Sequence, residues 1–366
     1  MIADRLRLAR RKAGYSLREL SAAMDGKVTA QAIGKYERGE STPSSGVLTA
    51  LAKALGVSLT YLLDTQGIEL SDAEFRTKAS TSARDRAKVK TDVLEWIERY
   101  LQVERVLELD SASWQCPIDP PRKLRGPDEG ERLAEDVRQQ WDLGHDPIPN
   151  MTELLEEKGL KVLTTDLPQP VSGLTCLVKR TDGQDELPVI VVNNEFPLER
   201  RRLTLAHELA HRVIDTASVA DREEEKAATV FAGAFLMPRD HFLREVGKRR
   251  NALGYKELID LKRVYRVSGA ALLVRMRQLE VIEESTLIYA FQTVARGWRT
   301  EEPEQLEPVD ERGTREQALR FERLCYRALA EKLISLGKAS ELLRRPVPDV
   351  ETGLKGPKSA AAGRHQ

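Results

Sequence analysis

Cysteine and histidine are both scarce in this sequence, and each scarcity narrows what the chain can be. The three cysteines lie far apart and are odd in number, so they form neither a disulfide framework nor a zinc ribbon. A reducing compartment is therefore expected. Only five histidines occur among 366 residues, and two of them, His207 and His211, are four residues apart. Two histidines this close together, in a chain with so few, indicate a functional site at that position.

Long apolar runs are also absent. No stretch of about 18 apolar residues occurs, so the sequence predicts no segment that spans a membrane. The opening MIADRLRLARRKAG has no apolar core after its basic residues, and a secretory signal is not expected. Together with the cysteine content, these features predict a cytoplasmic protein. The net charge does not indicate a class of binding partner, because 58 Lys and Arg balance 58 Asp and Glu.

The charge is unevenly spread, and residues 1–63 are basic. They contain ten Lys or Arg and five Asp or Glu, which leaves an excess of +5 in a chain that is neutral overall. A local excess of this kind favours contact with a polyanion. Apolar spacing and the caps at Ser16 and Thr29 divide the stretch into five short helices. The third of them runs from Thr29 to Arg38 and stops at Gly39.

The same stretch resembles a DNA-binding family. The runs GYSLRELS and VTAQAIGKYERG, followed by a proline and LAKALGV, are similar to the Cro/C1-type (XRE) helix-turn-helix domain over residues 2–63. The resemblance implies a double-stranded DNA operator as partner, with the third helix in the major groove. It places three residues at base edges and three at phosphates. The residues at base edges are Ala30, Gln31 and Lys35. The residues at phosphates are Thr29, Arg18 and Arg38. The alternative is a five-helix protein-interaction module.

A highly charged, helix-favouring stretch extends from Ala83 to about Leu109. Its apolar residues recur at helical spacing, which predicts one long amphipathic connector helix. The apolar stripe needs a partner, either the following domain or a second copy of the chain, so a homodimer is one expectation. Residues 116–130 contain four prolines and read as a linker. We expect the N-terminal helices to form a separate core joined to the rest by this connector.

The stretch LTLAHELAHRVI, residues 203–214, carries the clearest chemistry. Its His-Glu-x-x-His pattern places His207 and His211 on one face of a helix, because positions i and i+4 lie side by side. Zinc in a catalytic site takes three protein ligands and keeps one position open, so a third ligand is needed. Glu208 can reach a metal-bound water as general base. The alternative is an ordinary amphipathic helix.

Helical periodicity alone does not identify the third metal ligand. The next helix carries Glu223, Glu224 and Glu225, and helical spacing does not choose among them. Asp215 and His241 are formal candidates as well, although one is close in sequence to the histidine pair and the other follows a proline. Any of these side chains is of a type that binds zinc.

A small sheet is predicted just before the His-Glu-x-x-His helix. Strand-like runs occupy residues 160–164, 173–178 and 189–193, with a turn signal at Asp182-Gly183. This order predicts an α+β domain. An edge strand beside a metal can bind substrate backbone by strand addition, and residues 173–178 are the candidate on order alone.

A second resemblance covers about residues 131–288. The segments PVIVVN, RRRLTLAHELAH, EKAATVFAGAFLMP and LKRVYRVSGAALLVRM are similar to the ImmA/IrrE family of zinc metallopeptidases. The resemblance implies that Glu225 is the third ligand, which leaves Glu223 and Glu224 as a solvated acidic helix start. It also implies one Zn²⁺ per chain and endopeptidase activity. The implied substrate is a helix-turn-helix repressor, or the chain itself.

The predicted fold class is multidomain: an all-α helix-turn-helix of five short helices, a long connector helix, an α+β metallopeptidase-like domain and a helical C-terminal region. At the C-terminal end, Arg315–Leu336 is predicted as a helix capped by Thr314, and Lys338–Leu343 as a shorter one. The predicted parts are residues 1–64, 65–130, 131–300, 301–345 and a disordered tail, 346–366.

The function predicted from these parts is a DNA-binding transcriptional regulator with a zinc-dependent endopeptidase domain. The alternative is a transcription factor or antitoxin whose metallopeptidase-like domain is a non-proteolytic sensor or dimerisation domain. The carboxylate of Glu208 distinguishes the peptidase from the non-proteolytic alternative, because only a peptidase requires a carboxylate at this position.

Overall fold

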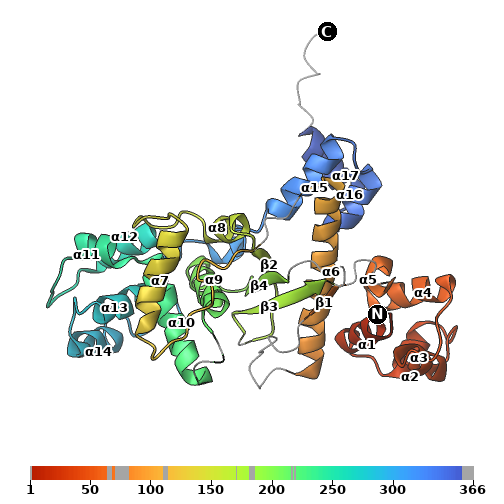
Figure 1. The fold of residues 1–366 in the computed structure, drawn as a ribbon, viewed down its shortest axis with the longest axis horizontal. Coiled ribbons are helices and arrows are strands. Elements are labelled where there is room, and N and C mark those ends of the chain that lie inside the picture. Colours follow the sequence, from red (N-terminus) through yellow and green to blue (C-terminus); the bar gives the residue numbers. More distant parts are fainter. Residues whose placement is uncertain are drawn as a thin grey trace, which may run out of the picture.

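A computed structural model describes residues 2–63, 68–70, 82–109, 114–169, 171–180, 186–215, 217 and 220–356. One small sheet lies near the centre, with helical regions on either side of it (Figure 1). Among the described helices, none combines the length and the apolar character that crossing a membrane requires.

The N-terminal region forms the five short helices that the sequence predicts. They are α1 (Ile2–Ala13), α2 (Leu17–Ala23), α3 (Ala30–Glu37), α4 (Ser45–Leu55) and α5 (Leu59–Leu63). Ser16 and Glu19 form a reciprocal capping box at α2, and the Thr29 hydroxyl accepts the N–H of Ala32 at α3. These caps satisfy N–H groups that the first helical turn leaves unpaired.

The connector forms a single helix, α6 (Ala83–Val106), as predicted. Its apolar stripe packs inside the same chain, because one continuous core joins α1, α4, α5, α6 and one face of the sheet. The expectation of a separate N-terminal core is therefore wrong. Two ion pairs tie α1 to α6: Arg5 Nη2 lies 2.9 Å from Glu98 Oε1, and Lys12 Nζ lies 2.7 Å from Asp92 Oδ1.

The sheet has four described strands in the order β1-β3-β4-β2. They are β1 (Ile68–Leu70), β2 (Lys161–Thr165), β3 (Gly173–Arg180) and β4 (Leu187–Asn193). The three predicted strands are confirmed, whereas β1 was not predicted. β2 and β4 are parallel, and β3 runs antiparallel to both β4 and β1. β1 pairs only with Val178, Lys179 and Arg180.

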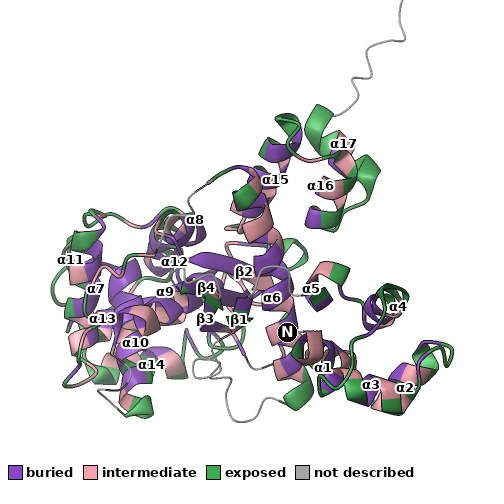
Figure 2. Ribbon diagram, turned by 45° about the vertical axis from the view of Figure 1, so that its right-hand side comes forward, coloured by how far each residue is buried: buried purple, intermediate pink, exposed green. Residues whose placement is uncertain are grey.

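Both faces of the sheet are covered. Along β4, Ile190 and Val192 belong to the core around α9, whereas Val189 and Val191 belong to the core around α6. Successive side chains point to opposite faces of a strand, so a strand covered on both sides needs apolar residues throughout. Every residue of β4 is buried, and Figure 2 shows the sheet enclosed between helices.

The central domain contains α9 (Leu198–Val213) and seven other described helices. They are α7 (Glu129–Gln140), α8 (Met151–Glu157), α10 (Asp221–Leu236), α11 (Arg239–Val246), α12 (Tyr255–Tyr265), α13 (Gly269–Gln278) and α14 (Glu284–Gln292). α9 and α10 pack against each other and share one core with α7 and α8. This packing fixes α9 between the sheet and α10.

The C-terminal region departs from the prediction at α15 and at α17. α15 (Arg320–Ala330) ends six residues earlier than expected, and Leu336 begins the next helix. α15 also begins five residues later than expected, and Thr314 does not cap it. The reason is tertiary: Arg201 donates to the carbonyl of Arg315 at 2.8 Å, and Arg202 pairs with Glu316, which holds this segment against α9. After α16 (Leu336–Leu343), residues 347–355 form α17 instead of a disordered tail.

α17 (Val347–Lys355) is ordered because it has a small core of its own. Val350 is buried against Leu329 and Ala339. The sequence signal was weak, because two valines and one leucine among small and polar residues look like a solvated segment. Residues 357–366, with His365, lie outside the described part of the chain.

Candidate metal centre

α9 holds the histidine pair at the edge of a cleft. Its buried side is apolar, with Leu205, Ala206 and Leu209 in the core, and His207 and His211 project from the opposite side. The two Nε2 atoms are 3.2 Å apart. One helical turn between the histidines therefore converges both imidazoles on one point.

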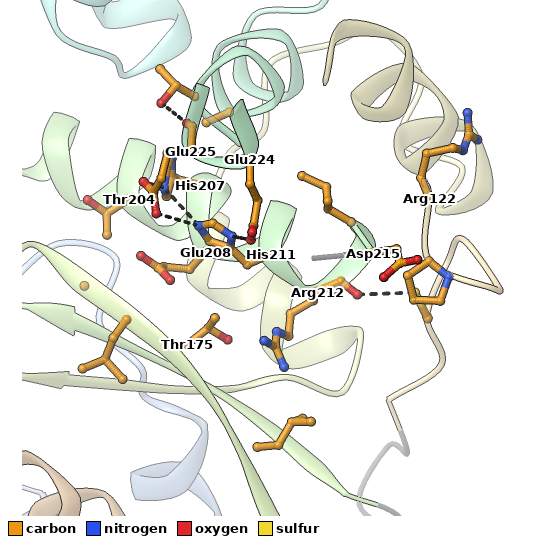
Figure 3. Close-up of a pocket in the computed structure, with 18 of the residues that line it drawn as sticks. Arg122, Thr175, Thr204, His207, Glu208, His211, Arg212, Asp215, Glu224 and Glu225 are labelled. Atoms are coloured by element: carbon orange, nitrogen blue, oxygen red, sulfur yellow. Dashed lines mark hydrogen bonds and ion pairs between the residues drawn. The ribbon is translucent and has the colours of Figure 1, made fainter. Parts of the chain in front are cut away.

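α10 brings a carboxylate to the same point. Glu225 Oε2 lies 3.3 Å from His207 Nε2, and Glu225 Oε1 lies 3.8 Å from His211 Nε2. The ligand atoms of His207, His211 and Glu225 all lie within 4.8 Å of one another (Figure 3). The three predicted ligands thus come together, although their role as ligands stays a prediction.

The other candidate ligands lie elsewhere. Glu223 pairs with Lys226 at 2.9 Å on the outer side of α10. His241 Nδ1 lies 2.8 Å from the hydroxyl of Tyr265, away from the cleft. Asp215 lines the cleft, but it does not join the cluster of His207, His211 and Glu225 among the described residues.

Glu224 has a position that the sequence reading missed. It is 2% exposed, and its Oε1 lies 2.7 Å from His211 Nδ1. The prediction of a solvated Glu224 is therefore wrong. A carboxylate on Nδ1 fixes the ring and leaves Nε2 facing the cluster, which is how outer carboxylates orient metal-binding histidines. The spacing held a signal, because Ala228 and Phe231 follow Glu224 on one buried helix face.

The acid–base properties of the site follow from burial. Burial raises the pKa of Glu208, and the nearby His211 and His207 only partly oppose this effect. Burial alone would lower the pKa of His211, but the hydrogen bond that its Nδ1 donates to Glu224 and the charge of Glu208 raise it overall. A buried carboxyl with a raised pKa is the form expected of a general base working near neutrality.

The cluster fits a zinc ion. Two imidazole nitrogens and one carboxylate are the donor set of many catalytic zinc sites, which keep a fourth position for water or substrate. The Glu224–His211 contact adds the outer carboxylate that such sites use. Glu208 lies on the same helix turn and faces the same cleft (Figure 3).

Four parts of the chain line the cleft, and one of them is α10, through Glu225 and Thr229. α9 forms its floor, residues 171–175 and 177 form one side, and the proline-rich linker forms the other with residues that include Cys116, Pro121 and Arg122. The linker is fixed by its backbone, because Arg122 N donates to Val213 O at 2.8 Å and Arg122 O accepts from Asp215 N at 2.9 Å. The linker thus shapes the site as well as connecting domains.

β3 enters the cleft at Gly173. A Cβ atom there would lie 2.4 Å from Thr204 Cγ2 and 2.8 Å from Val191 O. Glycine therefore lets the strand approach α9 beside Glu208. β4 pairs with one edge of this part of β3. On the other edge β1 pairs with Val178–Arg180, and the structure describes no strand beside residues 173–177.

The predicted DNA-contacting residues gather at α2 and α3. Five of them are exposed: Arg18, Thr29, Gln31, Lys35 and Arg38. Ala30 is half-buried, and the Thr29 side chain caps α3 by accepting the N–H of Ala32 at 3.2 Å. Arg38 Nη2 donates to Glu40 Oε2 at 3.0 Å, so a phosphate would compete with this carboxylate. The contacts themselves stay predictions.

Two family profiles match the chain. One, described as an IrrE N-terminal-like domain, matches residues 155–277, and one described as a helix-turn-helix matches residues 6–62. A comparison with curated proteins gives no match. The first range includes β2 to β4 and the cluster of His207, His211 and Glu225, and the second includes most of α1 to α5. The predicted fusion of an XRE-type domain with an ImmA/IrrE-like domain is confirmed.

Proposed function

We propose that this chain, which joins a helix-turn-helix domain to an IrrE N-terminal-like domain, is a DNA-binding transcriptional regulator with a zinc-dependent endopeptidase domain. One observation carries the proposal. His207, His211 and Glu225 converge within 4.8 Å in a cleft that Glu208 also lines. A helix buried only for packing needs neither that convergence nor an acid beside it.

The side chains divide the work. His207, His211 and Glu225 would hold Zn²⁺, which when bound polarises a carbonyl and acidifies a water. Glu208 takes the proton of the attacking water and passes it to the leaving amine. Glu224 holds the His211 ring. The edge of β3 away from β4, where no partner strand for residues 173–177 is among the described residues, aligns the substrate backbone by strand pairing.

The substrate is a polypeptide, because the cleft is not a small closed pocket and the edge of a strand, β3, forms one of its sides. A helix-turn-helix repressor is the substrate that we propose for a regulator of this composition. The chain itself is the second candidate substrate, because its own linker lies along the cleft. DNA binding by α3 brings the peptidase to the genes that it controls.

The decisive variant is Glu208→Gln. The amide keeps the size of the carboxylate and leaves the zinc ligands intact, but it cannot accept a proton at neutral pH. General-base catalysis is worth roughly 10²–10⁴-fold in rate, so cleavage should fall by that factor. Zinc content and operator affinity should not change. The measurement is mass spectrometry of repressor and self-cleavage products, with zinc analysis and DNA titration of the same samples.

The non-proteolytic alternative predicts a different outcome. If the domain is a sensor or a dimerisation domain, Glu208→Gln behaves like the parent in every assay, and cells carrying it induce normally. Equal induction by the parent and the variant would end the peptidase proposal.

A further inference from the structure

A second cavity adjoins the metal cleft at the N-terminal end of α9. Its walls come from the start of α9, the start of α13 and the segment from Trp298 to Arg312. Arg200 and Leu203 line both cavities, so the two lie next to each other along α9. Arg200 precedes His207 by seven residues, which corresponds to roughly 10 Å along the helix axis.

Three arginines line this cavity. The Arg200 guanidinium carbon lies 3.7 Å from the centre of the Phe196 ring, and that of Arg299 lies 4.6 Å from the Phe291 ring. Arg312 donates to the carbonyl of Glu195 at 3.2 Å, and its buried Nε has no partner. Over the described part of the chain, none of the three is paired with a carboxylate.

The acidic groups of the cavity are mostly engaged elsewhere. Glu199 and Glu302 are both held at Lys262, and Glu302 also accepts the N–H of Gly269 at 2.7 Å. Glu195 is exposed and accepts a hydrogen bond from Gln169 at 3.2 Å. The lining therefore carries three arginines and three glutamates, and Lys262, which pairs with two of these glutamates, brings the local formal charge to +1.

We propose that this arginine pocket, defined by Arg200, Arg299 and Arg312, binds an acidic segment of the polypeptide that is cut at the metal cleft. The inference rests on the proposed peptidase function. Stacking on aromatic rings fixes the guanidinium planes in advance, and a guanidinium can bind a carboxylate through two parallel hydrogen bonds. Because the two cavities are adjacent at Arg200 and Leu203, a polypeptide bound at the metal cleft can extend to this pocket, which favours a polypeptide over a free anion.

The geometry also sets the spacing. An extended chain rises about 3.3 Å per residue, so roughly three residues span the distance from the zinc site to Arg200. The first acidic side chain is therefore expected about three residues from the scissile bond, with further acidic residues beyond it.

Binding is tested first, because it does not depend on cleavage. A fluorescent hexaglutamate peptide is titrated into the full-length Glu208→Gln protein. Arg200→Gln and Arg299→Gln should each weaken binding roughly 10- to 100-fold, the usual worth of a hydrogen bond to a charged group. Arg296→Gln is the matched control, since Arg296 is exposed nearby but does not line the pocket. Equal loss in the control, or binding of inorganic phosphate but not of the peptide, would overturn the proposal.

Cleavage is tested second, with the active protein. Peptide pairs carry Glu or Gln three to five residues from the scissile bond, on either side. The Glu peptide should be cut faster by the parent, and Arg299→Gln, which lies outside the metal cleft, should remove that preference. Equal cutting of both peptides by the parent overturns the arginine pocket while leaving the peptidase intact. If no peptide is cut, the peptidase proposal fails, and the binding titration still decides the pocket.

Discussion

At the residue scale, Glu224 and Glu225 are sequence neighbours with opposite surroundings. Glu224 is buried on His211, whereas the side chain of Glu225 is 64% exposed and reaches the cluster from the rim. A ligand and an orienting group differ in how much metal affinity they control. Glu225→Ala should abolish tight zinc binding, and Glu224→Gln should weaken it about 10- to 100-fold.

The measurement for this pair is zinc retention against a competing chelator, read by elemental analysis. Glu223→Ala is the matched control, because Glu223 pairs with Lys226 outside the cleft. Full zinc retention by Glu225→Ala would move the third ligand to another residue.

Gly173 tests how closely β3 must approach α9. In Gly173→Ala the new methyl group would clash with Thr204 and the carbonyl of Val191. Overpacking of this kind costs about 1–3 kcal/mol, so the free energy of unfolding should fall by that amount in urea denaturation. Gly126→Ala is the control, since nothing lies within 4 Å of a Cβ placed there. A silent Gly173→Ala would show that the strand and helix separate easily.

The DNA-contacting residues separate into two kinds by their expected effects. Gln31→Ala and Lys35→Ala should each cost about 1–3 kcal/mol on the operator and relax preference for one base pair. Arg38→Ala should weaken all DNA sequences alike and flatten the dependence on salt. Titrations on operator and random DNA at several salt concentrations measure this. Equal losses on both DNAs for all three variants would exclude α3 as the reading helix.

At the element scale, the sequence was informative where periodicity was strong. The strands β2, β3 and β4 and the helix α9 carry patterns that no other element type explains, so they could be predicted. The convergence of His207 and His211 followed from helical spacing alone. Glu225 needed the resemblance, because spacing could not rank it against Glu224.

The elements that escaped prediction are those fixed by tertiary contact. β1 is only Ile68–Leu70, too short for alternation to show, and it exists through pairing with β3. Arg315 and Glu316 favour a helix locally but bond to Arg201 and Arg202 instead. For α6, the apolar stripe indicated that a face is covered but not by what, since hydrophobic burial is not directional.

At the scale of the whole molecule, the helix-turn-helix and α6 should open together. They share one core and the ion pairs of Arg5 and Lys12. Hydrogen exchange should therefore give amides of α1 and α6 similar opening free energies. Ile97→Ala, in the middle of α6, should destabilise both by about 2–5 kcal/mol. Exchange of α1 through an opening that leaves α6 protected would contradict this.

A matched control for that experiment lies at the other end of the molecule. Ile288 on α14 is 47% exposed, so Ile288→Ala removes the same methylene groups from a site outside this core. Its effect on α1 and α6 exchange should be within about 0.5 kcal/mol.

Because the apolar stripe of α6 is used within the chain, it cannot also join two chains. One chain presents one reading helix, and one reading helix recognises a single half-site. A palindromic operator, with half-sites about 10 base pairs apart, would require two chains that meet through another surface. An asymmetric operator would fit a lone chain. The symmetry of the protected DNA in a footprinting experiment therefore reports how many chains bind, before any assembly is measured in solution.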